Sequence, residues 1–168
     1  MDEILVSNKA SRLPPAIADF GIDSFVVVWT DVSDTAIKGQ RFGISGRKSF
    51  DEFQVNTTTA GIHHGPAVAR LFGFPAGFIV AWIADHPPVR DVLFQRFSDD
   101  GRKFGEVRAN SKNVNPGRLP AIVSLLDGNF VVCWTDSADL GGIRARIFST
   151  DGTARGSEFQ VNTSAGVH

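Results

Sequence analysis

Apolar and polar positions alternate along this chain in short stretches that return three times. The most regular stretch reads Phe-Val-Val-Cys-Trp-Thr-Asp at residues 130–136, and it recurs at residues 25–31 and, with changes, at 78–85. The tryptophan of each copy follows that of the preceding copy at intervals of 53 and 52 residues. A regular period of this length is typical of repeat architectures.

Each repeat divides into four apolar stretches that are too short to form helices. In the first repeat they are residues 15–18, 25–31, 39–42 and 52–56. β-Branched residues and apolar–polar alternation are typical of strands, and turns rich in aspartate and glycine between such stretches indicate hairpins. Because no segment has helical periodicity, the pattern predicts an all-β fold made of four-stranded antiparallel meanders.

The whole chain, residues 1–168, is predicted to be a single repeat domain. Glu-Ile-Leu-Val at residues 3–6 resembles the fourth stretch of a repeat and is predicted to form one extra strand. The predicted parts are the extra strand at 1–12, repeat one at 13–62, repeat two at 63–116 and repeat three at 117–168. The last residues, 165–168, match the start of a repeat, so the chain stops where another would begin.

Composition and charge exclude several classes of partner. With 42% hydrophobic and 21% charged residues, the chain is expected to be globular and soluble. A net charge of −1 gives no reason to expect nucleic acid or a membrane as partner. No signal peptide and no membrane span are predicted, so we expect a cytoplasmic location for a complete protein and a cell-surface or secreted one for a fragment. Cys133 is the only cysteine and is expected to be a small buried residue.

The repeated motifs resemble those of a known architecture. A Pro-Ala-Ile-Ala strand, a Gly-Phe-Val-Val-x-Trp strand, a Ser-x-Asp-Gly turn and a terminal Val-Asn cover nearly the whole chain. Together they resemble the blades of Asp-box β-propellers, the sialidase-like fold, and blade-like tandem repeats of large bacterial surface proteins. The resemblance implies a β-propeller with three four-stranded blades. The turns at 98–101 and 149–152 lack the aromatic residue of the Asp-box, so their aspartates are expected to form turns rather than a site.

Three blades do not close a ring. Propellers typically have four to eight blades, so three would leave two apolar blade faces uncovered. A homodimer that closes a six-bladed ring is the simplest solution. The alternative fold is a β-trefoil, which also has three four-stranded repeats and needs no partner. The nearly continuous apolar second strand requires cover on both faces and favours the propeller.

Polar residues gather in the connections that would share one rim of such a ring. The candidates for ligand binding are Asp31, Asp85, Asp136, His63, His64, His86, Arg12 and Arg118. A ring of carboxylates could bind a cation or the hydroxyl groups of a sugar, whereas the alternative is that each aspartate caps its own turn. The histidines are expected to be solvent-exposed loop residues. No familiar metal-site spacing occurs, so no metal and no cofactor are predicted.

Catalytic motifs are missing from the sequence. Sialidases use a tyrosine nucleophile, and this chain has no tyrosine. It also has no nucleophile elbow, no His-Glu-x-x-His pair and no phosphate-binding glycine loop. We therefore expect a non-enzymatic binding module for a carbohydrate or a protein. The alternatives are a structural or protein-interaction repeat without a small-molecule site, and an unrecognised glycoside hydrolase.

Overall fold

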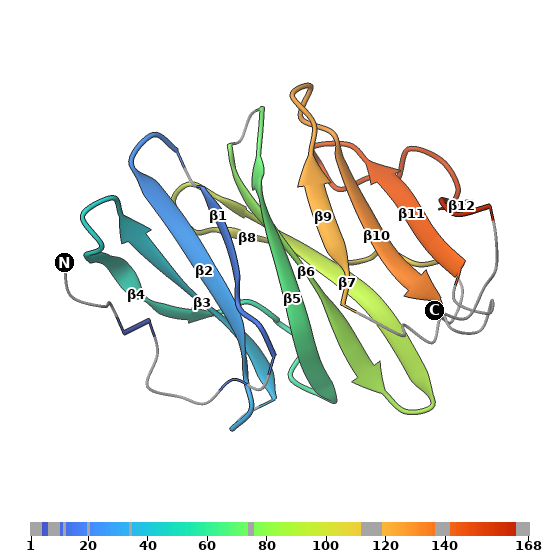
Figure 1. The fold of residues 1–168 in the computed structure, drawn as a ribbon, viewed down its shortest axis with the longest axis horizontal. Helices are drawn as coiled ribbons and strands as arrows, with labels where there is room; N and C mark the ends of the chain where they lie inside the picture. Colours follow the sequence, from blue (N-terminus) through green and yellow to red (C-terminus); the bar gives the residue numbers. More distant parts are fainter. Residues whose placement is uncertain are drawn as a thin grey trace.

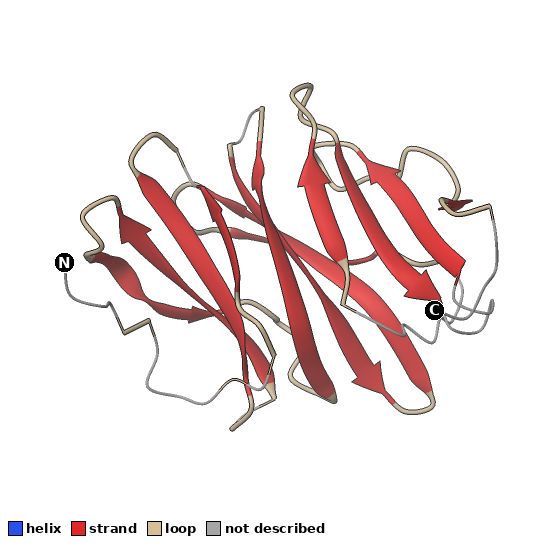
Figure 2. Ribbon diagram, viewed as in Figure 1, coloured by secondary structure: helices blue, strands red, loops and turns tan. Residues whose placement is uncertain are grey.

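The computed structural model describes residues 5–6, 11, 13–19, 21–33, 35–73, 76–111, 119–136 and 142–163. Within these ranges every regular element is a β-strand (Figure 2), and none is a helix long and apolar enough to cross a membrane. The strands are β1 (Ala16–Asp19), β2 (Ser24–Asp31), β3 (Ala36–Gly43), β4 (Lys48–Gln54), β5 (Ile62–Leu71), β6 (Gly77–His86), β7 (Val89–Ser98), β8 (Lys103–Arg108), β9 (Ala121–Ser124), β10 (Phe130–Asp136), β11 (Gly142–Phe148) and β12 (Phe159–Gln160).

The strands form three four-stranded antiparallel sheets, one for each predicted repeat. Sheet 1 has the order β1-β2-β3-β4, sheet 2 the order β5-β6-β7-β8 and sheet 3 the order β9-β10-β11-β12. The all-β class and the four-stranded meander are therefore confirmed. No described strand pairs with a strand of another sheet. A β-trefoil would instead combine strands of all three repeats in one barrel.

The three sheets stack, with sheet 2 in the middle (Figure 1). The innermost strands β1, β5 and β9 lie side by side, with β5 between the other two. Successive side chains of a strand point to opposite faces, so β6 serves both neighbours. Val80 and Trp82 pack in a cluster with residues of sheet 1, and Ile79 and Ala81 pack in a cluster with residues of sheet 3. This two-sided burial explains the continuous apolar run in the sequence.

Each sheet contains the same stacked pair of phenylalanines between its second and third strands. In sheet 2, the rings of Phe78 and Phe97 lie 4.7 Å apart with an interplanar angle of 5°. Sheet 1 and sheet 3 have the corresponding pairs at 5.1 Å and 5.4 Å. The phenylalanine that ends each third stretch therefore has a structural role, because it pairs across the strands with the first residue of the tryptophan motif.

An asparagine is the last residue of each fourth stretch, and its side chain binds the neighbouring strand. The side-chain oxygen of Asn56 accepts the backbone N–H of Ile37 at 2.9 Å, and that of Asn110 accepts the N–H of Val92 at 2.7 Å. Asn162 does the same in sheet 3. These side chains satisfy buried backbone donors after the outer strand has ended, which explains the repeated Val-Asn of the sequence.

The predicted extra strand falls mostly outside the described residues. Of its segment, Leu5 and Val6 are described and neither is part of a strand. Val6 is partly buried against Val27, Trp29 and Phe42, on the face of sheet 1 that points away from sheet 2.

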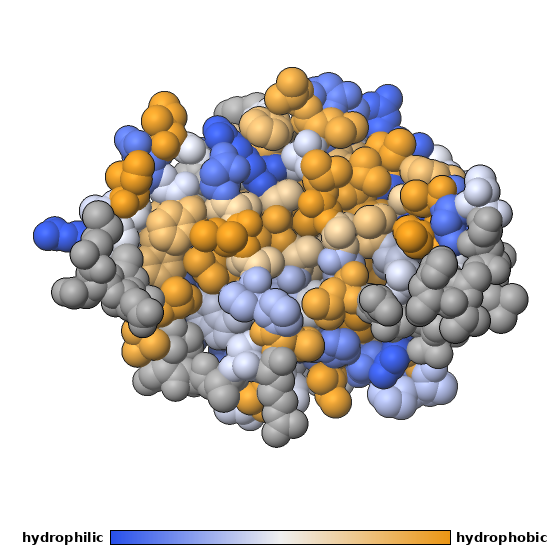
Figure 3. All heavy atoms as spheres, viewed as in Figure 1, coloured by the Kyte–Doolittle hydropathy of each residue, from blue (hydrophilic) through white to orange (hydrophobic). Residues whose placement is uncertain are grey.

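Hydrophobic side chains gather across the middle of one face of the molecule (Figure 3), over the innermost strands β1, β5 and β9. Two of them are well exposed, Ile17 at 65% and Val123 at 55%.

Candidate functional site

The three aspartates predicted on one rim all lie at the end of the second strand of their sheet. Asp31 and Asp136 are the last residues of β2 and β10, and Asp85 is the last but one of β6. All three are buried. The Oδ1 atom of Asp31 accepts the backbone N–H of Ser33 at 3.0 Å and its hydroxyl at 2.6 Å. Asp31 therefore caps its own turn, which was the alternative to a ligand-binding role.

The carboxylate of Asp85 contacts two side chains of the protein, those of His64 and Arg90. Its Oδ2 atom lies 3.1 Å from Nε2 of His64, and its Oδ1 atom lies 2.6 Å from Nε of Arg90. The side chain of Asp85 is only 12% exposed. Because both oxygens already have close partners within the protein, this carboxylate is not open to a ligand in the conformation observed.

The prediction that His63 is an exposed loop residue is wrong. His63 lies in β5 and is 0% exposed. The indole N–H of Trp82 donates to Nδ1 of His63 at 3.1 Å, so Nε2 carries the ring proton and donates to the Ala60 carbonyl at 3.0 Å. Burial lowers the pKa of His63. A neutral imidazole with both nitrogens occupied has a structural role and is not available to a metal.

The other predicted rim residues do not form a metal centre in the part of the chain that is described. His64 also lies in β5, not in a loop, and His86 ends β6, with its ring 5.5 Å from that of His63. Arg12 and Arg118 lie outside the described residues. No group of three or more histidine, cysteine, aspartate or glutamate side chains there could hold a metal ion.

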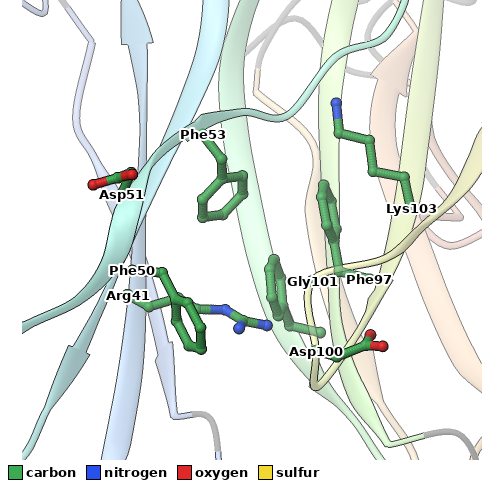
Figure 4. Close-up of a pocket in the computed structure, with 9 residues that line it drawn as sticks. Arg41, Phe50, Asp51, Phe53, Phe97, Asp100, Gly101 and Lys103 are labelled. Atoms are coloured by element: carbon green, nitrogen blue, oxygen red, sulfur yellow. The ribbon is translucent and has the colours of Figure 1, made fainter.

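A pocket lined by none of the predicted ligand-binding residues lies between sheets 1 and 2 (Figure 4). Its volume is about 160 Å³. This volume is close to that of a cavity that holds one six-membered ring. It is smaller than the volume of most pockets that bind drug-sized ligands. The lining residues are Arg41, Phe50, Asp51, Phe53, Phe78, Phe97, Asp100, Gly101 and Lys103.

Aromatic rings form the walls of this pocket. The ring of Phe53 in β4 lies 5.6 Å from Phe97 and 6.1 Å from Phe78. Phe53 takes this position because it pairs across the strands with Gly39, whose missing side chain leaves room for the ring. A Cβ atom at Gly39 would lie 2.6 Å from the Phe53 ring. The wall therefore depends on a glycine in the neighbouring strand.

Arg41 crosses from sheet 1 to sheet 2 beneath the aromatic walls. Its guanidinium lies 5.4 Å from the ring centres of both Phe50 and Phe78, and Nη2 donates to the Ser98 carbonyl at 3.1 Å. Burial lowers the pKa of Arg41, while the charges of nearby aspartates raise it. An arginine remains protonated under these conditions, so the pocket contains a fixed positive charge against aromatic faces.

Phe50 has an unusual backbone conformation for an aromatic residue. Its φ is 66°, it lies at a bulge between β3 and β4, and it is 75% exposed. Sheets 2 and 3 have a glycine with positive φ in the corresponding segments, Gly105 within β8 and Gly156 before β12. A bulky residue with positive φ is a genuine outlier, and such strain is concentrated at functional sites. The sequence did contain a signal for this site, because the bulge glycine of repeats two and three has no counterpart in repeat one.

Charged groups surround the mouth of the pocket. Asp100 accepts hydrogen bonds from the Ser98 hydroxyl and the Arg102 N–H, and these bonds lower its pKa, the one from Ser98 most. Asp100 and the exposed Lys103 approach from sheet 2, whereas the carboxylate of Asp51 points away from the opening (Figure 4). The pocket thus combines apolar walls with ionic groups at its edge.

The junction between sheets 2 and 3 has a different lining. Val107 and Ala154 occupy there the positions of Phe53 and Lys103. Arg96 still lies over Phe104 at 4.8 Å, as Arg41 lies over Phe50. The second aromatic wall and the lysine are therefore particular to the junction of sheets 1 and 2.

Comparison with known proteins does not assign this chain to a family. It matches no protein-family model and no curated protein.

Proposed function

We propose that this chain is a non-enzymatic, propeller-type binding module that takes a sugar ring in the pocket between sheets 1 and 2. The three sheets would be blades, and a second copy of the chain would close a ring of six. The observation that carries the proposal is Phe50, an exposed aromatic residue held at positive φ beside the guanidinium of Arg41. The rim aspartates of the sequence prediction support it less, because Asp31 and Asp85 already bind groups of the protein.

The chemistry of the pocket suits a carbohydrate. A sugar ring has faces of C–H groups and a perimeter of hydroxyl groups, so it needs flat apolar walls and polar groups at the edge. Phe50 and Phe53 offer such walls, and Asp100 and Lys103 offer an acceptor and a donor at the mouth. The volume of about 160 Å³ allows one ring at a time. Tight binding would then require several pockets in one assembly.

Binding to immobilised glycans, followed by titration calorimetry with the best one, tests this proposal. We expect Phe50→Ala to weaken binding about tenfold, because it removes an exposed wall without emptying the core. Phe104→Ala is the matched control, since Phe104 in β8 lies against Arg96 as Phe50 lies against Arg41, at the junction where the second aromatic wall is missing. This variant should bind like the original chain. Equal affinity of Phe50→Ala and the original chain would contradict the pocket.

The same assay separates the alternative sites. Loss of glycan binding in Asp136→Ala with unchanged binding in Phe50→Ala would move the site to the predicted rim. Turnover of a glycoside panel would favour the glycoside hydrolase. No binding to any glycan would favour the interaction repeat, a reading that the uncovered apolar face of sheet 3 also supports.

A further inference from the structure

Sheet 3 exposes on its outward face the same positions that sheet 1 buries against sheet 2. Ile37 in β3 is 0% exposed, whereas the corresponding Ile143 in β11 is 36% exposed. Val55, which follows β4, is 0% exposed, whereas the corresponding Val161 after β12 is 53% exposed. The burial at sheet 1 comes from the next sheet in the stack. Sheet 3 therefore has the surface of a blade whose neighbour is missing.

Sheet 1 has the complementary surface on its own outward face. Val27, Trp29 and Phe42 form a cluster there that corresponds to the one that sheet 2 presents to sheet 1. On sheet 2 this cluster receives Val55 from the outer strand of sheet 1. On sheet 1 it receives Val6. The face is thus already shaped for a valine that arrives from an outer strand, and Val161 is such a residue.

Polar contacts between neighbouring sheets also follow a repeated rule. The carboxylate of Glu106 in β8 accepts the backbone N–H of Thr57 at 2.6 Å and that of Thr58 at 3.0 Å. In sheet 3, Glu158 accepts the backbone N–H of Ser111. In both cases a glutamate in the outer strand or directly before it binds the segment that follows the outer strand of the preceding sheet. These contacts are charge-assisted hydrogen bonds and therefore fix the register of two sheets.

Glu52 is the corresponding glutamate of sheet 1, which is the first of the three sheets among the described residues. It is exposed, and it makes no hydrogen bond or ion pair with another described residue. The residue that corresponds to Thr57 and Ser111 after the last outer strand is Thr163. We propose that a second copy of this chain docks sheet 3 on the outward face of sheet 1, with Glu52 bound to the backbone N–H of the partner's Thr163.

A second copy fits this surface because one chain supplies both halves of the contact. Two chains related by a two-fold axis would form the junction twice and leave no blade face uncovered. The six blades that result lie within the usual range of closed propellers. This inference rests on the propeller arrangement of the proposed function, and it is independent of the ligand.

Light scattering across a dilution series tests the docking. We expect the original chain to have twice the mass of the 18.1 kDa monomer. Val161→Asp should be monomeric, because it places a charge in the apolar contact. Glu52→Lys should weaken the dimer about tenfold or more. Both side chains are exposed, so circular dichroism and the melting temperature of the monomer should stay unchanged. The control is Asp51→Lys, which makes the same change of charge at the residue before Glu52 and should dimerise normally.

Mixing the two interface variants shows whether sheet 3 meets sheet 1 or another sheet 3. A mixed dimer of Val161→Asp and Glu52→Lys has both substitutions at one junction and none at the other. We therefore expect the mixture to recover dimers that neither variant forms alone at the same concentration. A monomeric original chain, dimers insensitive to both substitutions, or a mixture without recovery would each overturn the proposed docking.

The outcome can be separated from that of the ligand proposal. The pocket lies between sheets 1 and 2 of one chain, so Phe50→Ala should lose glycan binding in an intact dimer. A dimer without glycan binding would contradict the ligand alone, and a glycan-binding monomer would contradict the docking alone.

Discussion

Phe50 adopts a conformation that costs free energy unless the residue is needed for another reason. A non-glycine residue in the left-handed region loses about 1 kcal/mol or more relative to glycine. We therefore expect Phe50→Gly to be more stable than Phe50→Ala by about 1 kcal/mol, as measured by urea unfolding. Both variants lose the ring, so the comparison isolates the backbone. Equal stability of the two would show that the bulge is not strained.

The burial of His63 predicts that the protein loses stability in mild acid. Burial lowers its pKa below the ordinary 6.5, so below that pH the unfolded chain binds a proton that the folded chain resists. The free energy of unfolding should be greatest above pH 6.5 and fall as the pH decreases, by at most about 1.4 kcal/mol per pH unit from this group. Urea unfolding at several pH values measures the slope.

The control for this pH dependence is His63→Gln. Glutamine keeps an acceptor for the indole N–H of Trp82 but does not titrate. The slope between pH 7 and pH 5 should therefore be smaller in the variant, since residue 63 no longer titrates. An unchanged slope would assign the acid sensitivity to residues other than His63.

Residue types alone predicted the site poorly. Asp31 and Asp85 were chosen because carboxylates at strand ends can bind ligands, but hydrogen bonds with Ser33 and His64 decide their role. Which partner a polar side chain finds depends on strand register, and a single sequence does not specify register to one residue. The prediction for His63 was wrong because β5 begins at Ile62, four residues before its proline, and continues through a bulge between His64 and Ala67.

At the scale of elements, the glutamate contacts between sheets should be measurable one at a time. Glu106→Gln replaces a carboxylate that binds Thr57 and Thr58 by a neutral acceptor. We expect a loss of about 1 kcal/mol in the free energy of unfolding, because these charge-assisted bonds are exposed. Glu52→Gln should leave the stability of the monomer unchanged. If both substitutions lowered the melting temperature of the monomer equally, Glu106 and Glu52 would not differ in their contribution to its stability.

The strands themselves were largely predictable from the sequence. The three copies of the tryptophan stretch became β2, β6 and β10, and the turn residues between stretches became hairpins. Period-two alternation and β-branched runs specify strands locally, which is why these elements were predictable. The fourth stretch of repeat three was the exception, since β12 has only two residues.

At the scale of the whole molecule, the stacking of the sheets follows from one rule applied twice. The tryptophan sides of sheets 2 and 3 pack on the preceding sheet, and the opposite sides of the second strands of sheets 1 and 2 pack on the following one. Three repeats thus leave one face of each kind at the two ends. The nearly equal spacing of the tryptophans indicated this repeated arrangement. The pocket between sheets 1 and 2 depends instead on the pairing of Phe53 with Gly39, which has no side chain to fill the space of the ring.

The position of Val6 has a consequence for how such chains would assemble over time. A contact between unlike ends can close a ring, but it can also add subunits without limit and grow a filament. Because Val6 covers the receiving end, an arriving chain has to displace it before it can bind. Each addition of a chain would then require the displacement of Val6 from sheet 1, which is a kinetic barrier to growth. In a closed ring, two chains displace the Val6 residues of each other and no end is left for growth. Such a ring would be favoured over a fibre.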